Sequence, residues 1–373
     1  MIDLSQRITK KVENYHFIGF YNRLKKINKK SGTSNSAQYH FEKKFYRSLF
    51  LDKSNINFMI LGDIDLLLNF ENSELYKKHR LYFLLAMSKE ARKLEPFRRH
   101  FLIEMSNLPK YLKVELRRKD IDAISEEVRG RCNDVFSYKI FSRITKAVEY
   151  NPDSWNAYNY LSLFSPKVCP YCNLDQTPTL TELLGRNKIK YTLRPPIDHF
   201  LSKDHFPFFS LSVRNLIPSC TTCNSSLKRD INFKEILHIS PSARGLGLSS
   251  NFSIRLTSND MLLKAIEDIY NQDKIDYEKF SITFESDCDL SKQNIDTFKI
   301  IERYNSIKEQ YRFFIEKIPA LTSERISSLM LLLGFSSEKK AIEYFLEFDT
   351  DPDKFCDVPL SLLKNDLVRQ YLN

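Results

Sequence analysis

Two Cys-x-x-Cys pairs constrain the fold of this chain more than any other feature of its sequence. Cys169 and Cys172 form the first pair, and Cys220 and Cys223 form the second. Each Cys-x-x-Cys turn directs two thiolates at one ion, and two such turns complete the tetrahedral four-sulfur shell that structural zinc prefers. Disulfides are disfavoured without a secretion signal, and a redox site would need one pair on a βαβ unit. We therefore predict a structural Zn²⁺ site on these four cysteines.

Composition favours helices and excludes several classes of function. Glycine occurs 8 times in 373 residues, whereas an average chain of this length would contain about 26. The sequence has no Gly-rich phosphate loop that ends in Gly-Lys-Ser/Thr. It also has no apolar run near the roughly 18 residues that a membrane span requires. We expect a cytoplasmic protein with no membrane partner, in a reducing compartment that suits thiolate ligands.

The positive charge is concentrated in two segments. The chain carries a net charge of +10, but residues 1–50 alone hold eleven Lys/Arg and three Asp/Glu, a net +8. Residues 186–234 hold nine Lys/Arg and three Asp/Glu, a net +6. The remainder of the chain is therefore slightly acidic. Clustered basic residues are the electrostatic signature of contact with a phosphate backbone. A solvated helix face explains the N-terminal cluster equally well.

Sequence periodicity divides the chain into three regions. Apolar residues at helical spacing predict a helical region over 1–150, with helices near 4–27, 75–94 and 121–150 and a loop over 30–38. Residues 151–235 hold both cysteine pairs, with a strand over 188–193, a hairpin over 197–218 and a short helix over 221–230. Residues 236–373 read as mainly helical, with strands at 252–256 and 280–284. Three helices are predicted over 322–373, with residues 329–333 in the core.

The motif between the cysteine pairs resembles the HNH, or ββα-metal, endonucleases. That family combines Asp-His on a first strand, an Asn in the hairpin, and Cys-x-x-Cys-His/Asn followed by a Lys. The matching residues here are Asp198, His199, Asn215, Cys220, Cys223, Asn224 and Lys228. The last position of the cysteine motif holds Asn where many members have His, and either side chain offers a neutral ligand atom. The resemblance implies an α+β, mostly helical protein with a central zinc-stapled HNH module between helical flanks.

The resemblance also implies a role for each residue of the motif. Asp198 and Asn224 would bind a catalytic divalent cation, which we expect to be Mg²⁺ or Mn²⁺, with Ni²⁺ as a third candidate. His199 would deprotonate the attacking water, and Asn215 would orient the hairpin around it. Lys228 would add positive charge at the scissile phosphate. Adjacent strand residues point to opposite faces, so Asp198 and His199 share a site only if the strand ends or twists there.

The tripeptide Asp-His-Phe occurs twice, at 198–200 and at 204–206. We favour the first copy because it follows an apolar strand and leaves sixteen steps to Asn215, which is room for a hairpin loop. His205 precedes Pro207 and a run of phenylalanines, which indicates a loop that packs against other elements. The second copy is therefore predicted to be structural.

A looser resemblance concerns the region after the nuclease motif. Residues 295–305 are similar to an extension seen in HNH effectors of bacterial anti-phage defence, of the Septu-type and retron-linked systems. The leading hypothesis is a metal-dependent HNH endonuclease that cuts DNA, as a defence effector that works with a partner protein such as an ATPase. RNA is left open as a substrate. Two alternatives remain: a stand-alone restriction-type endonuclease, and a non-catalytic, zinc-stapled module that binds nucleic acid.

Overall fold

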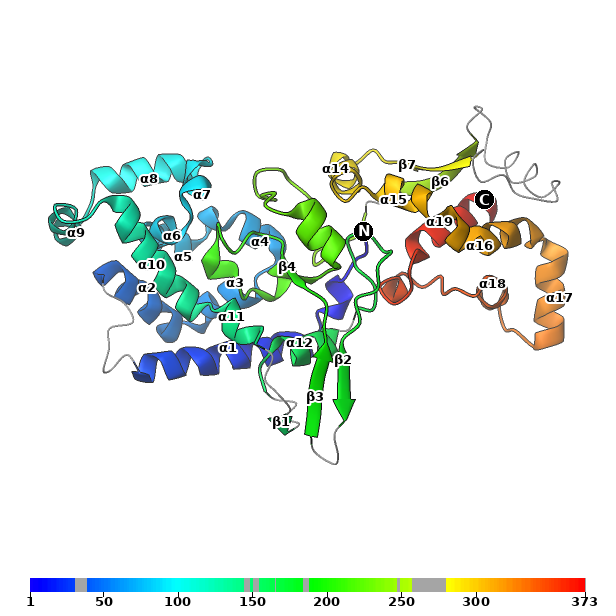
Figure 1. Cartoon of the computed structure of the whole chain (residues 1–373), viewed down its shortest axis with the longest axis horizontal. Coiled ribbons are helices and arrows are strands. Elements are labelled where there is room, and N and C mark those ends of the chain that lie inside the picture. Colours follow the sequence, from blue (N-terminus) through cyan, green and yellow to red (C-terminus); the bar gives the residue numbers. More distant parts are fainter. Residues whose placement is uncertain are drawn as a thin grey trace.

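The computed structural model describes residues 1–30, 39–143, 148–149, 154–164, 166–183, 188–246, 249–256 and 280–372. It is an α+β structure in which helices predominate and the sheets are small, as predicted. Figure 1 shows a helical N-terminal region on one side, the central strands in the middle, and the C-terminal helices on the other side.

The N-terminal region consists of many short helices around one long one. Its elements are η1 (Ser5–Arg7), α1 (Lys10–Lys30), α2 (His40–Leu51), α3 (Lys53–Leu61), α4 (Ile64–Leu68), η2 (Phe70–Asn72), α5 (Glu74–Lys78), α6 (Arg80–Ala86), α7 (Lys89–Lys93), α8 (Phe97–Ser106), α9 (Lys110–Glu115), α10 (Ile121–Val135) and α11 (Tyr138–Phe141). The side chains of α6 from Leu81 to Ala86 are all buried, so this helix lies at the centre of the region.

The central region carries two small sheets. Its elements are β1 (Val148–Glu149), α12 (Ala157–Phe164), β2 (Leu180–Leu183), β3 (Lys188–Leu193), β4 (Ile197–His199), η3 (Pro207–Phe209), η4 (Val213–Asn215), β5 (Leu216–Pro218) and η5 (Thr222–Lys228), the last being a π-helix. Strands β1, β3 and β2 form an antiparallel sheet that projects from the body of the molecule (Figure 1). Strands β4 and β5 form the predicted hairpin, with Asp198 opposite Ile217 and His199 opposite Leu216.

The C-terminal region combines one hairpin with several helices. Its elements are β6 (Asn251–Leu256), β7 (Phe280–Glu285), α14 (Asp289–Thr297), α15 (Ile300–Ser306), η6 (Lys308–Tyr311), α16 (Arg312–Lys317), η7 (Ile318–Ala320), α17 (Ser323–Leu333), α18 (Glu338–Leu346), η8 (Pro352–Lys354) and α19 (Ser361–Leu372). Strands β6 and β7 pair in an antiparallel register and occupy the positions that their alternating pattern predicts.

Aromatic packing joins the hairpin to the N-terminal helices. The loop between β4 and β5 carries Phe206, Phe208 and Phe209, all of which are fully buried. Their rings meet Phe70, which lies within 6.0 Å of each of them, and Phe208 meets Phe83 at 4.8 Å. Aromatic pairs at these spacings add to the free energy gained from burial alone. The N-terminal region therefore supports the loop that connects the two strands.

His16 fastens α1 to the same loop. Its ring is fully buried, and Nε2 lies 2.6 Å from the Leu211 carbonyl oxygen, to which it donates. The other nitrogen, Nδ1, accepts a hydrogen bond from the Trp155 indole at 3.2 Å. Burial lowers the pKa of His16 to about 4, so the ring is neutral at pH 7. A neutral imidazole thus joins α1, the loop and the segment before α12.

Four sequence predictions for the flanking regions are corrected or lie outside the described residues. The helix predicted over 75–94 is three helices, α5 to α7, and the one predicted over 121–150 ends at Val135. Residues 148–149 form β1 instead. Residues 329–333 were predicted in the core, yet Leu331 and Leu332 are 86 % and 79 % exposed. The loop predicted over 30–38 lies outside the described residues beyond residue 30.

Gly19 offers a test of the packing between α1 and Trp155. A Cβ atom at this position would lie 2.1 Å from Trp155 Cγ, whereas one at Gly130 in α10 would meet nothing within 4 Å. Gly19→Ala should lower the free energy of unfolding by roughly 1–3 kcal/mol through overpacking. Gly130→Ala should raise it by roughly 0.5–1 kcal/mol through helix propensity. Urea unfolding of both variants measures this difference, and an unaffected Gly19→Ala would contradict the packing.

Candidate functional site

The four predicted zinc ligands lie together. The ligand atoms of Cys169, Cys172, Cys220 and Cys223 are all within 4.8 Å of one another, and all four residues are buried. Among the described residues, this is the one group of three or more His, Cys, Asp or Glu side chains that could hold a metal ion. The chain thus brings two turns 48 residues apart onto a common point.

Local structure explains how each turn presents its sulfur atoms. The first turn is closed by the hydrogen bond from Asn173 N to the Cys169 carbonyl at 2.7 Å, and Asn173 adopts a positive φ of 49°. A single residue in this conformation reverses the chain, and Asn tolerates it better than most residues. The second turn follows β5, and Cys223 lies at the start of η5, with its amide 3.3 Å from the Cys220 sulfur.

The cluster makes further contacts with the C-terminal region. Arg303 in α15 donates to the Cys223 sulfur at 3.3 Å and to Asp175 at 2.8 Å. Its neighbour Tyr304 donates its hydroxyl to the Cys172 carbonyl at 2.7 Å. A guanidinium beside thiolates offsets part of their negative charge, as outer-shell partners of metal sites commonly do. The looser family resemblance, over residues 295–305, includes most of α15. In the structure, this helix contacts the cysteine cluster.

The donor set fits a zinc ion. Burial raises the pKa of the Cys169 thiol well above its ordinary value, because a thiolate there is deprived of water. A bound dication would offset that penalty, and binding would release the thiol protons. Four sulfur ligands with no open position are typical of a structural site rather than a catalytic one.

Removal of the metal should therefore unfold the centre of the molecule. Cys169→Ser should lose zinc and a large part of the stability, because structural zinc contributes about 10 kcal/mol or more to folding. Cys288→Ser, at a half-buried cysteine outside the cluster, should keep both. Zinc content by metal analysis and thermal melting measure this. Full stability of Cys169→Ser, or of the intact chain after chelation, would contradict a structural role for the cluster.

Asp198 lies in a buried ion pair with Lys228. The two residues are 5 % and 3 % exposed, and Lys228 Nζ lies 2.7 Å and 2.8 Å from the two carboxylate oxygens. Nζ also donates to the His199 carbonyl, and the Tyr171 hydroxyl donates to Asp198 Oδ2 at 2.6 Å. Burial lowers the pKa of Lys228, while the carboxylate acts in the opposite direction. The predicted phosphate-binding lysine is thus engaged with the predicted metal ligand.

This ion pair bears directly on the predicted catalytic cation. Lys228 Nζ lies among three oxygen atoms, two from Asp198 and one from the His199 carbonyl. Such a position suits a cation, and the Lys228 ammonium group occupies it here. Asn224, the other predicted ligand, is half-buried near the start of η5. These residues fit a divalent ion only after Lys228 has left the carboxylate.

Substitution of Lys228 separates these two roles of Asp198. Lys228→Met should lower the free energy of unfolding by about 3–5 kcal/mol, because it leaves a buried carboxylate unpaired. If the three oxygens form a cation site, Mn²⁺ should raise the melting temperature of this variant but not of the double variant Lys228→Met/Asp198→Asn.

The matched control for this experiment is Lys234→Met. Lys234 is also largely buried and pairs with Glu71 at 3.1 Å. Thermal melting with and without Mn²⁺ compares the three variants. Equal stabilisation of all three, or of none, would argue against a cation site at Asp198.

His199 is the last residue of β4 and directly follows Asp198. Nε2 lies 3.0 Å from the Ser210 carbonyl oxygen. A carbonyl only accepts hydrogen bonds, so Nε2 carries the proton and Nδ1 keeps its lone pair. Burial lowers the pKa of His199 to about 4, with Lys203 as the next cause. His199 is therefore neutral at pH 7 and has one nitrogen able to accept a proton.

Asn215 bridges residues of the loop between β4 and β5 through its side-chain amide. Its amide nitrogen donates to the carbonyls of Leu201 at 3.1 Å and Phe209 at 2.9 Å, and its oxygen accepts from the Leu201 amide at 2.6 Å. The side chain is fully buried. These three bonds fix both ends of the loop that carries Ser210, the partner of His199.

The second Asp-His-Phe copy lies in this loop and packs against the N-terminal region. His205 Nδ1 lies 2.7 Å from the Ser88 hydroxyl, and the Ser88 amide donates to the His205 carbonyl at 3.2 Å. Both contacts are to the loop before α7. His205 thus contributes to the packing of this loop against the N-terminal region.

Sequence reasoning missed two residues beside the motif. Tyr171 lies inside the first Cys-x-x-Cys pair and bonds Asp198, and Tyr138 packs its ring edge-on against His199, with 4.5 Å between centroids. The position of Tyr171 between two zinc ligands was a usable signal. Tyr138 gave none, because it lies 61 residues before His199 and outside the cysteine and Asp-His motifs.

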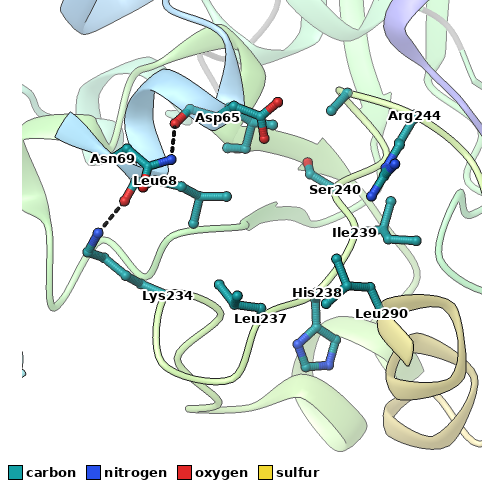
Figure 2. A pocket seen from close by; sticks show the side chains of 12 residues that line it. Asp65, Leu68, Asn69, Lys234, Leu237, His238, Ile239, Ser240, Arg244 and Leu290 are labelled. Carbon is teal, nitrogen blue, oxygen red and sulfur yellow. Dashed lines mark hydrogen bonds between the residues drawn. The ribbon is translucent and has the colours of Figure 1, made fainter. Parts of the chain in front are cut away.

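A separate pocket lies between α4 and residues 234–244. It has a volume of about 490 Å³, and Figure 2 shows Lys234, His238, Arg244 and Leu290 among its lining residues. Both ring nitrogens of His238 are engaged, with the Ile236 carbonyl and the Thr297 hydroxyl. None of the residues predicted for zinc binding or catalysis lines it.

Comparisons with protein-family models, with curated proteins and with solved structures find no match to this chain. Within the residues that the structure describes, no helix has both the length and the apolar character to cross a membrane. The assignment of function therefore rests on the residues of the site.

Proposed function

We propose that this chain is an HNH-type endonuclease that hydrolyses DNA phosphodiester bonds with His199 as general base. The observation that carries the proposal is the set of hydrogen bonds that His199 and Asn215 make with the hairpin loop. Ser210 accepts from His199 Nε2 at 3.0 Å, and Asn215 fixes the loop that presents Ser210. This arrangement leaves Nδ1 to take a proton, which is what water activation requires.

The chemistry follows from these groups. His199 Nδ1 accepts a proton from water as the water oxygen bonds to phosphorus. The bond from phosphorus to the departing sugar oxygen then breaks, and that oxygen takes a proton from solvent. A divalent cation held by Asp198 and Asn224 would stabilise the charge on the phosphate and the leaving oxygen. That ion and Lys228 would compete for the same carboxylate.

A second candidate function is a zinc-stapled module that binds nucleic acid without cleaving it. The observation that favours it is the buried ion pair between Lys228 and Asp198, which satisfies the carboxylate without a metal. Two further hypotheses stay predictions. One is that the protein works with a partner such as a defence ATPase, and the other is that it is a stand-alone restriction-type endonuclease. A restriction-type enzyme would cut mixed-sequence DNA at defined sites, which a cleavage map reveals.

The two copies of Asp-His-Phe provide a matched pair of variants. His199→Ala should slow nicking of supercoiled plasmid by about 100-fold or more, because general base catalysis typically contributes 10²–10⁴-fold. His205→Ala should cleave like the intact chain, since the His205 ring is hydrogen-bonded to Ser88 in the N-terminal region. Gel assays with Mg²⁺, Mn²⁺ and Ni²⁺ measure this, with zinc content as the check on folding. DNA binding without cleavage in any metal would favour the binding module.

A further inference from the structure

Two cations lie against Tyr138, the tyrosine that packs on His199, and neither has an acidic partner among the described residues. Arg194 follows β3, and Lys203 lies in the turn after β4. Neither forms an ion pair with any Asp or Glu of the described part of the chain, although Asp204 is the next residue after Lys203. The nearby Asp198, by contrast, pairs with Lys228. Arg194 and Lys203 therefore carry positive charge that no carboxylate of the described residues neutralises through an ion pair.

Tyr138 brings these cations and His199 together. Lys203 Nζ lies 5.4 Å from the centre of the Tyr138 ring, and the same ring packs against His199 at 4.5 Å. The Arg194 guanidinium lies beside the Tyr138 hydroxyl, where it acts to lower the pKa of Tyr138 against the larger, opposite effect of burial. One tyrosine thus contacts a general base candidate and two cations.

Arg194 is held in place by carbonyl groups rather than by a carboxylate. Nη1 donates to the Pro195 carbonyl at 3.0 Å and Nη2 to the Ser142 carbonyl at 3.4 Å, and the guanidinium lies 5.7 Å from the centre of the Tyr158 ring. Its Nε is buried and has no hydrogen-bond partner among the described residues. A half-buried guanidinium with spare donors and no counter-ion is suited to an oxyanion, because its planar fork matches phosphate geometry.

We infer that Arg194 and Lys203 form a phosphodiester-binding subsite that places the scissile phosphate of DNA beside His199. This inference rests on the proposed nuclease function and deepens it, because it names the residues that bind the substrate. It also accounts for their different exposure. Lys203 is exposed and meets the incoming backbone, whereas Arg194 is half-buried and fixes the orientation of the phosphate.

Salt dependence of DNA binding tests the subsite without relying on cleavage. A short fluorescein-labelled duplex is titrated by anisotropy without added divalent cation, over a range of salt concentrations. Each phosphate contact contributes about 0.9 to the slope of log affinity against log salt. Arg194→Gln and Lys203→Ala should each lower that slope by about this amount and weaken binding several-fold. Melting temperature and zinc content show that each variant is folded.

Matched controls remove equal charge from elsewhere on the surface. Lys113 and Arg117 are exposed and have no ion pair among the described residues. Lys113→Ala and Arg117→Gln should leave the slope close to that of the intact chain. If they change the slope as much as the subsite variants do, non-specific attraction explains the binding and the inference is wrong. A chain that binds no duplex at any salt concentration also overturns it.

Arg194→Lys separates charge from geometry. It keeps the positive charge, so the salt slope should be retained, but it lacks the planar fork. Plasmid nicking should therefore slow at least several-fold while binding changes little. Full activity of Arg194→Lys would overturn the role of Arg194 in orienting the phosphate.

The outcomes for the subsite and for the nuclease are distinguishable. Cleavage that depends on His199, with slopes unchanged in Arg194→Gln and Lys203→Ala, would leave the nuclease and remove the subsite. Altered slopes in a chain that never cleaves would leave the subsite as a DNA-binding element and remove the nuclease.

Discussion

Convergence of four cysteines on one point is the constraint on which the rest of the structure depends. Their ligand atoms lie within 4.8 Å of one another, and segments from both ends of the chain attach to the same turns. The Ile2 amide donates to the Pro170 carbonyl at 2.8 Å, and Tyr304 donates to the Cys172 carbonyl. Asn173 binds the carbonyls of Phe355 and Val358. A cation at this point would therefore stabilise contacts well beyond the central region.

The same cluster sets the surroundings of Asp198. Tyr171 lies in the first cysteine turn and Lys228 lies at the end of the helix that begins with the second, and both bond the Asp198 carboxylate. Tyr171 is further fixed by stacking on Phe298 at 4.4 Å. The geometry of the carboxylate thus depends on the two cysteine turns as well as on β4. Any change in the cluster should be transmitted to Asp198 through these two side chains.

The charges around Asp198 and around Tyr138 differ in how they are balanced. At Asp198, a buried carboxylate and a buried ammonium group neutralise one another. Around Tyr138, His199 is neutral, and Arg194 and Lys203 have no acidic counterpart among the described residues. Buried or half-buried charge is costly unless it is paired. The surroundings of Tyr138 are accordingly the part of the site that would gain most from a bound anion.

Much of this site could be predicted from the sequence, because its parts are short and local. Cys-x-x-Cys spacing fixes two sulfur atoms on one turn, and alternating apolar residues placed β6 and β7 correctly. The hairpin and its Asn215 followed from a motif of adjacent residues. The α+β, mostly helical class followed from scarce glycine and helical periodicity. The sequence by itself therefore determined which side chains lie close together within one turn or one hairpin.

The tertiary structure alone decided which of these residues meet. Lys228 pairs with Asp198, 30 positions away, because η5 packs against β4, and no sequence pattern distinguishes that contact from exposure to a phosphate. Tyr138 reaches His199 from α11 for the same reason. Periodicity also placed residues 329–333 in the core, yet Leu331 and Leu332 are exposed, since an apolar stripe does not specify what covers it. Local patterns follow from backbone geometry, whereas pairing between distant segments depends on how the whole chain packs.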